Sequence, residues 1–253
     1  MAKWYQVPKF MDASLWDRII GQYKGDPYRR LVMLPTILGL LPSIRGKKVL
    51  DIGTGNGFLI PHLLRKKPRI VVGIDKSSEL LSIAKTRLPQ NVRLIQGDIT
   101  KKFVLDETPF DVAICNFVLN EIENLFVACK NIARQFHKNS TLIVGVLHPF
   151  YSLGQYLRAG NKTVKDFERY FSEKKITEIY RNSRESIRLE NFSRPLSAYI
   201  NALLEAGFII EKTIEPQTPF RVVRENPCYK PYKDLPVSFY FLLRLHRYPV
   251  PFS

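Results

Sequence analysis

Cysteine is scarce in this 253-residue chain, and its three copies lie far apart. Cys115, Cys129 and Cys228 form no C-x-x-C pair, so their spacing argues against a disulfide framework and against a zinc site. We therefore expect buried free thiols. We predict no metal site.

Long apolar runs are also missing. The longest, residues 31–44, is interrupted by Pro35 and Pro42 and falls short of the roughly 20 residues that cross a bilayer. The segment 1–8 lacks the apolar stretch of a secretory signal. We expect a soluble, cytoplasmic protein that does not enter membranes.

Acidic residues are outnumbered by basic ones. The chain carries 39 lysines and arginines against 23 aspartates and glutamates, a net charge of +16. Such an excess is typical of proteins that bind nucleic acid. It is spread along the chain, however, and its densest cluster, residues 65–69, is short. We favour a solvated basic surface, and RNA or an anionic substrate remains an alternative.

Short apolar runs alternate with helical patterns from residue 46 onward. This alternation predicts an α/β fold, a Rossmann-like and mostly parallel sheet with helices on both faces. Ligands of such sheets bind outside the carboxyl ends of the strands. The strands are expected at 47–52, 69–74, 91–96, 110–116 and 141–147, and the helices at 58–65, 78–87 and 125–136.

Three further segments surround this core, residues 46–150, within one predicted domain spanning 1–253. Residues 1–45 are expected to be helical, residues 151–194 form an α+β insert after the fifth strand, and residues 195–253 complete the sheet. An insert at that point lies over the ligand edge of the sheet. Within these three segments we expect helices at 12–23, 27–41 and 195–206, strands at 208–213 and 237–245, and a two-stranded ribbon that pairs 176–181 with 186–190.

A glycine-rich turn follows the first strand. Its pattern is Gly53-x-Gly55-x-Gly57, whereas dinucleotide-binding loops read G-x-G-x-x-G. Asp51 stands just before the turn, where a carboxylate would repel a pyrophosphate. S-adenosylmethionine (SAM) carries no phosphate, and its ammonium group suits a carboxylate at that point. The turn therefore favours SAM over a dinucleotide.

The next two strands also end on carboxylates. Asp75 closes the second strand, where an acid can take both ribose hydroxyls, and this fits either cofactor. Asp98 follows the third strand, where it can accept a hydrogen bond from an adenine amino group while Ile99 packs on the ring. Each acid alone is also compatible with a surface or capping role, but three at successive strand ends indicate a nucleoside site.

With these motifs the sequence resembles the small-molecule class I SAM-dependent methyltransferases. The matching segments are Val49–Gly57, Gly73–Asp75, Gly97–Ile99 and Phe110–Leu119. The resemblance implies a seven-stranded sheet whose last strand is antiparallel, an N-terminal helical lid, and SAM as cofactor with S-adenosylhomocysteine as product. The cofactor-binding residues we predict are Asp51, Gly53, Thr54, Gly55, Gly57, Phe58, Asp75, Lys76, Asp98, Ile99, Asn116, Phe117 and, from the lid, Tyr23 and Tyr28.

Two residues are candidates for a catalytic role. His148 follows the fifth strand and is the expected general base for a nucleophile that holds its proton, with a structural role as the alternative. Glu121 follows the fourth strand and is either a contact for a substrate amine or a helix-start carboxylate. As substrate-binding residues we predict Asn120, Tyr151 and Tyr170.

The leading prediction is methyl transfer to N or O of a small-molecule acceptor by a monomer or homodimer. An RNA or peptide methyltransferase is the alternative, although residues 116–119 lack the Asn/Asp-Pro-Pro-aromatic pattern of enzymes that methylate base amines. A non-catalytic SAM-binding protein and a dehydrogenase complete the alternatives.

Overall fold

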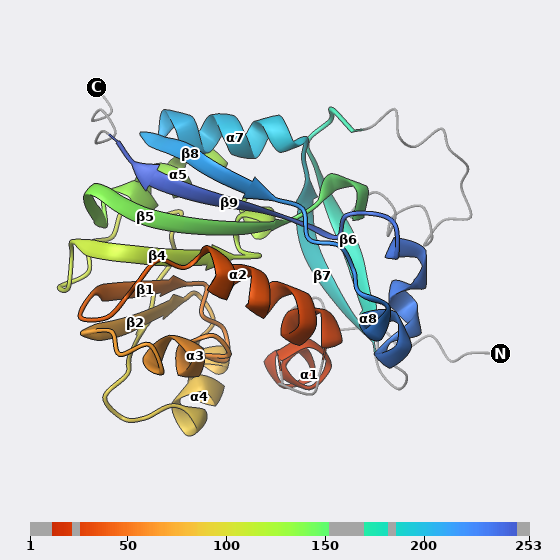
Figure 1. Cartoon of the computed structure of the whole chain (residues 1–253), viewed down its shortest axis with the longest axis horizontal. Helices are drawn as coiled ribbons and strands as arrows, with labels where there is room; N and C mark the ends of the chain where they lie inside the picture. The colour runs from red at the N-terminus through yellow and green to blue at the C-terminus, as the bar shows by residue number, and fades with distance from the viewer. Residues whose placement is uncertain (1–11, 22–25, 152–169, 182–185, 247–253) are drawn as a thin grey trace.

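The computed structural model describes residues 12–21, 26–151, 170–181 and 186–246. Its centre is a seven-stranded sheet in the order β3-β2-β1-β4-β5-β9-β8 (Figure 1). β1 to β5 are parallel, and β9 runs antiparallel to both of its neighbours, as expected. The strands are β1 (Lys48–Ile52), β2 (Ile70–Asp75), β3 (Arg93–Gln96), β4 (Phe110–Asn116), β5 (Phe136–Leu147), β8 (Phe208–Ile214) and β9 (Ser238–Leu245).

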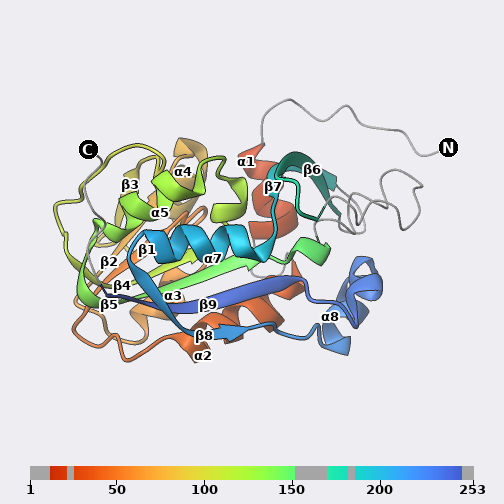
Figure 2. The same ribbon diagram turned by 90° about the horizontal axis from the view of Figure 1, so that it is seen from above.

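Helices cover both faces of the sheet, which confirms the predicted fold class (Figure 2). The apolar side chains of β1 alternate in direction, so Leu50 and Ile52 pack toward α5 and α7. Val49 packs on the opposite face, with α2 and α3. The helices are α1 (Ala13–Trp16), α2 (Leu34–Leu40), α3 (Ile60–Leu64), α4 (Ser78–Arg87), α5 (Leu125–Ala133), α7 (Leu196–Glu205) and α8 (Phe220–Glu225), with shorter turns η3 (Leu119–Glu121) and η5 (Pro227–Tyr232).

Capping residues and prolines define several helix ends. The Ser77 hydroxyl accepts a 3.1 Å hydrogen bond from the Leu80 N–H, so Ser77 is the N-cap of α4. α2 ends just before Pro42, as the sequence indicated. The N-terminal helices differ from expectation, because each contains a π-helical stretch, η1 (Asp17–Gly21) and η2 (Arg29–Met33).

Three other predictions were wrong in detail. The helix expected at 125–136 ends at Ala133, and β5 begins five residues before the predicted 141. α8 and η5, between β8 and β9, were not predicted. Of the three thiols, Cys115 and Cys129 are buried in the core, but Cys228 on η5 is exposed.

The insert covers the edge of the sheet formed by the carboxyl ends of the parallel strands. Its described part is an antiparallel ribbon, β6 (Lys174–Arg181) paired with β7 (Ser186–Ser193), longer at both outer ends than predicted. Figure 1 shows this ribbon and α8 at the end of the sheet toward which the parallel strands run. β7 contacts η3, which follows β4, and so the insert reaches the core at that point.

Candidate active site

A deep cavity lies at this edge, between the strand ends, the N-terminal helices and the ribbon. It contains about 1230 Å³ of empty space, counting the solvent at its mouth. Ligand pockets typically hold about 300–1,000 Å³. The walls come from four parts of the chain: the ends of β1 to β5, η1 with the start of η2, β7, and the stretch from η5 to β9.

The glycine turn forms one wall. Gly53 and Gly55 line the cavity and have φ of +66° and +53°, a left-handed conformation that glycine adopts without strain. A Cβ on Gly53 would overlap Cγ2 of Val118, so backbone and neighbour are in close approach. The turn therefore presents main chain, with little side chain, to a ligand.

Asp75 ties the end of β2 to this turn. Its Oδ2 accepts a 2.8 Å hydrogen bond from the Gly55 N–H, and its Oδ1 accepts one of 2.9 Å from the Ser77 N–H. Burial raises the pKa of Asp75, and these two backbone bonds counter part of the rise. Asp75 lines the cavity, and each oxygen keeps a lone pair for a further donor.

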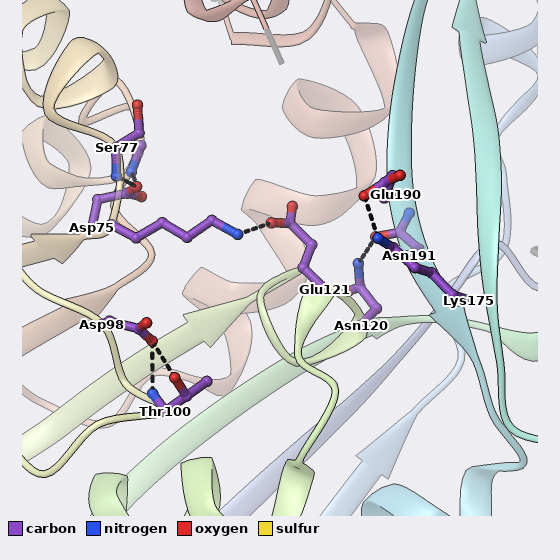
Figure 3. A network of polar contacts seen from close by, with 11 residues as sticks. Asp75, Ser77, Asp98, Thr100, Asn120, Glu121, Lys175, Glu190 and Asn191 are labelled. Atoms are coloured by element: carbon purple, nitrogen blue, oxygen red, sulfur yellow. Dashed lines mark hydrogen bonds and ion pairs between the residues drawn. The ribbon is translucent and has the colours of Figure 1, made fainter. Parts of the chain in front are cut away.

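Asp98 and Ile99 line the cavity after β3. Oδ1 of Asp98 accepts from the backbone N–H and the hydroxyl of Thr100, at 2.9 and 2.7 Å (Figure 3). Among the described residues, Oδ2 has no donor. Partial burial raises the pKa of Asp98, but the Thr100 bonds outweigh it and bring the pKa below its usual value. The carboxylate is thus ionised and has one oxygen open to the cavity wall.

Asp51 is placed differently from what the sequence suggested. It is buried and is absent from the described cavity lining, and its Oδ2 accepts a 2.7 Å hydrogen bond from the hydroxyl of Thr54, which does line the cavity. Burial raises the pKa of Asp51 to about 7, and the nearby charge of Asp75 adds to the rise. Asp51 therefore lies beneath the turn and is linked to the cavity through Thr54.

Gly57 and Phe58 are likewise outside the described lining. A Cβ on Gly57 would lie 2.6 Å from Cδ1 of Leu88, so this glycine serves the packing of the turn on α4. The ring of Phe58 lies 4.4 Å from the guanidinium carbon of Arg29, which does line the cavity. Phe58 thus supports a cavity residue from behind.

The N-terminal helices close one side of the cavity. Arg29, Tyr28 and Asp26 all line it. Burial lowers the pKa of Arg29 to about 10, which leaves it charged at neutral pH, and Asp26 favours that charge. Tyr28 donates to or accepts from Ser238 at 2.7 Å and stacks on Tyr229 with 5.5 Å between ring centroids. Tyr23 lies outside the described residues.

Asp26 and Tyr229 were not predicted as site residues. The Tyr229 hydroxyl donates a 2.8 Å hydrogen bond to Oδ2 of Asp26, while desolvation raises the pKa of this carboxyl. The two are 203 positions apart in the chain. No local pattern connects them, because only the fold brings η5 beside the start of η2.

Asn116, the last residue of β4, and Phe117, which follows it, line the cavity. Phe117 has a φ of +57°, and its N–H donates to the Gly145 carbonyl at 2.8 Å. A positive φ is strained for a phenylalanine, so the surrounding structure enforces this sharp turn. It redirects the chain from β4 into η3, which carries the next two site residues.

Glu121 and Lys76 both line the cavity and are partly exposed, which places them at its mouth. The Lys76 Nζ lies 3.4 Å from Oε2 of Glu121, and the pair joins the end of β2 to η3. Both side chains are partly exposed, so the pair adds little to stability. It places a carboxylate and an ammonium group at the entrance.

Asn120 and Asn191 form a buried amide pair in the cavity wall. The Asn120 Nδ2 donates a 2.8 Å hydrogen bond to Oδ1 of Asn191, which joins η3 to β7 (Figure 3). The sequence predicted Asn120 as a substrate contact but missed Asn191. The insert was expected over the site, yet nothing in its pattern indicated which of its residues reach the core.

His148 does not line the described cavity, in contrast to its expected position. It is buried, its Nε2 lies 3.0 Å from Oε1 of Glu215, and its Nδ1 accepts from the Phe150 N–H at 3.2 Å. Burial lowers the pKa of His148, and Glu215 partly offsets this. Its carbonyl accepts from the N–H of Tyr151, which does line the cavity.

Tyr170, the other predicted tyrosine of the insert, is absent from the described lining. Its hydroxyl accepts a 3.3 Å hydrogen bond from the Leu196 N–H, and its ring packs edge-on against Phe171 at 5.1 Å. The position supports the start of α7.

Among the described residues, no group of His, Cys, Asp and Glu could hold a metal ion.

The residues present fit SAM. Three features follow one another along the cavity wall: a turn that presents mostly main chain, the carboxylate of Asp75 bonded to that turn, and the carboxylate of Asp98 with one oxygen that has no described donor. These three features suit the methionine portion, the ribose and the adenine respectively. Arg29 adds a partly buried cation to the cavity lining, suited to a carboxylate.

Comparison with known proteins agrees with this geometry. Residues 44–185, more than half of the chain, match the family model described as a methyltransferase domain. The chain therefore belongs to this family, and it is a SAM-dependent methyltransferase.

Relatives were found in several bacteria. An uncharacterised protein of Haemophilus influenzae is 28% identical over 81% of this chain and 82% of its own length. A demethylmenaquinone methyltransferase of Chlorobaculum tepidum is 30% identical, over 45% of this chain and 44% of its own. A ubiquinone biosynthesis O-methyltransferase of Vibrio vulnificus is 30% identical over 46% and 51%.

Solved structures share the fold. A Listeria monocytogenes protein, proposed to be a SAM-dependent methyltransferase, superposes with a TM-score of 0.68 at 23% identity, over 84% of this chain and 96% of its own. A SAM-dependent methyltransferase of Mesorhizobium loti gives 0.63 at 17%, over 83% and 96%. In the described segments, no helix is long and apolar enough to cross a membrane.

Proposed function

We propose that this enzyme transfers the methyl group of SAM to nitrogen or oxygen of a small molecule. The observation that carries the proposal is the charge of the cavity. Its described lining contains four acidic residues, Asp26, Asp75, Asp98 and Glu121, against the two cations Arg29 and Lys76. A chain of net charge +16 thus has an acidic cavity, which is unfavourable to a polyanion such as RNA.

The cavity walls suit a small acceptor. Beyond the residues assigned to the cofactor, Tyr28, Tyr151 and Tyr229 line the cavity together with Leu147 and Val237. Aromatic and aliphatic walls with few polar groups are typical of small-molecule sites. The two named relatives are a demethylmenaquinone methyltransferase and a ubiquinone biosynthesis O-methyltransferase, names that also favour a small acceptor.

The cofactor supplies an electrophilic methyl group when it is bound. The chain aligns the acceptor with that group and excludes water. We propose Glu121 as the proton acceptor where the nucleophile is a hydroxyl, because its carboxylate lines the cavity mouth. His148 is better placed to hold the turn that carries Tyr151 than to receive a proton from the substrate.

The proposal is tested with methyl-labelled SAM and a cell extract separated into metabolites, RNA and protein. Incubation with the purified enzyme is expected to place label in the metabolite fraction, and Glu121→Gln is expected to reduce it. Label confined to RNA or to protein would overturn the proposal, and so would SAM binding without transfer to any fraction.

A further inference from the structure

The Asn120–Asn191 pair is an unusual feature of the cavity wall. Both residues are nearly inaccessible, at 3% and 2% exposure, although both line the cavity. One comes from η3 of the core and the other from β7 of the insert, joined by the 2.8 Å bond from Nδ2 of Asn120 (Figure 3). The pair fixes the ribbon to the core at the site itself.

This bond leaves part of Asn120 unsatisfied. Its Oδ1 is buried and has no hydrogen-bond partner among the described residues. A buried acceptor without a donor destabilises the folded state, so such atoms are rare unless a ligand or water supplies the missing donor. Oδ1 of Asn116, on the same β4–η3 segment, is also buried and without a described partner. Both of these unsatisfied oxygens are hydrogen-bond acceptors.

The acids assigned to ribose and adenine lie at the ends of β2 and β3, and the predicted cofactor residues nearest to Asn120 in the chain, Asn116 and Phe117, lie at the end of β4. Asn120 comes later, in η3, and Asn191 belongs to the insert. We infer that the Asn120–Asn191 pair is the polar anchor of the acceptor site and that the acceptor presents an amine N–H or hydroxyl O–H to Oδ1 of Asn120. This inference rests on the proposed small-molecule function and specifies the chemistry of its substrate.

The anchor has a consequence for selectivity. A site that hydrogen-bonds a donor rejects an analogue without one, because the analogue leaves the buried oxygen unpaired. Asn191 orients the Asn120 amide and is a positioning residue. Glu190, the next residue on β7, instead pairs with Lys175 at 2.6 Å, and both of these side chains are largely exposed (Figure 3). It provides a matched control on the same strand.

The test measures binding of paired aromatic probes to the enzyme saturated with S-adenosylhomocysteine. Phenol and aniline carry the donor, while anisole and N,N-dimethylaniline lack it, and saturation-transfer NMR gives each dissociation constant. Wild type is expected to prefer the donor-bearing probes about 3- to 10-fold. Asn120→Leu is expected to abolish the preference, Asn120→Asp to keep it for aniline, and Glu190→Gln to leave it unchanged.

Affinity for S-adenosylhomocysteine and the unfolding temperature show whether each variant is intact. If Asn120→Leu does not fold, Asn120→Ala removes the same oxygen without adding a branched side chain. The inference is overturned if wild type shows no preference, binds none of the probes, or keeps its preference without the amide. If the wild-type enzyme labels metabolites and the Asn120 variants keep the wild-type probe preference, this inference alone is refuted. If the wild-type enzyme labels no metabolite, the proposed function is refuted.

Discussion

The hydroxyl of Thr54 donates a 2.7 Å hydrogen bond to Oδ2 of the buried Asp51, which links the acid at the end of β1 to the cavity-lining turn. Burial raises the pKa of this carboxyl to about 7. Asp51 therefore titrates in the neutral pH range, and its negative charge increases as the pH rises.

The first prediction concerns the pH dependence of cofactor binding. If Asp51 attracts the ammonium group of S-adenosylhomocysteine, the ionised acid binds the ligand more tightly. The ionised fraction rises about tenfold between pH 6 and pH 8 for a pKa of about 7. Calorimetry is expected to show affinity increasing over this range by up to that factor, and an equal affinity at both ends would contradict the role.

The stability of the ligand-free enzyme is expected to change in the opposite direction. A carboxyl whose pKa is higher in the folded state stabilises the fold below its unfolded pKa, near 3.8, and this contribution is lost as pH rises through about 7. Asp51→Asn is the control, since it should flatten both the affinity profile and this part of the stability profile.

The second prediction concerns the glycine turn. Gly53→Ala places a Cβ onto Val118 at a φ of +66°, so we expect loss of measurable S-adenosylhomocysteine binding and a lower unfolding temperature. Gly46→Ala is the matched control, because Gly46 has a φ of +71° but open space around its Cβ. It should cost only about 1 kcal/mol of backbone strain and keep the affinity. Similar affinities for both variants would show that the turn does not approach the ligand.

The third prediction concerns adenine recognition by Asp98. Oδ2 has no donor among the described residues, so we expect it to accept from the adenine amino group. S-inosylhomocysteine has a carbonyl there and should bind wild type about tenfold or more weakly than S-adenosylhomocysteine. Asn at position 98 offers a donor, so Asp98→Asn should narrow or reverse this difference. Unchanged discrimination would refute the contact, and Asp106→Asn on the exposed surface is the control.

The fourth prediction concerns the attachment of the N-terminal helices. Nη1 and Nη2 of Arg87 on α4 both bond the buried Asp17 of η1 at 2.6 Å, and Asn56 donates to the same carboxylate. Arg87→Met removes both hydrogen bonds of the ion pair between Arg87 and Asp17. With a discount for the partial exposure of Arg87, we expect a loss of about 1–2 kcal/mol in unfolding free energy.

Limited trypsin digestion gives a second measurement for this variant. Cleavage should accelerate selectively in the first 30 residues, and the affinity for S-adenosylhomocysteine should fall, because Arg29 and Tyr28 of the adjoining segment line the cavity. Arg93→Met, which removes the ion pairs of the half-exposed Arg93 with Asp106 and Glu107, is the control. Equal digestion of both variants would argue against the attachment.

The sequence predicted the sheet and the nucleoside acids because both depend on local patterns. Runs such as 70–75 are apolar on both faces of the sheet, Asp75 ends β2, and Asp98 comes two residues after β3. The long-range part of the site was not predictable in this way. Asn120 and Asn191 are 71 positions apart, and Asp26 and Tyr229 are 203 apart.

His148 and Asp51 show a related limit. Their positions near strand ends were correctly inferred, but a side chain at a strand end can point either into the cavity or away from it. Whether a side chain enters the cavity depends on its neighbours. Here Glu215 pairs with His148, and Thr54 bonds Asp51 and lines the cavity in its place. Neither partner is indicated by spacing along the chain.

The central claim is that one cavity holds the cofactor and, beside it, a small acceptor anchored at Asn120. A crystal structure of the enzyme with S-adenosylhomocysteine tests it most directly. The account predicts the adenine amino group within hydrogen-bond distance of Asp98, the ribose at Asp75, and the sulfur facing free cavity volume bounded by Asn120 and Tyr151. A ligand bound elsewhere, or a sulfur that faces open solvent with no enclosed space beside it, would contradict the account.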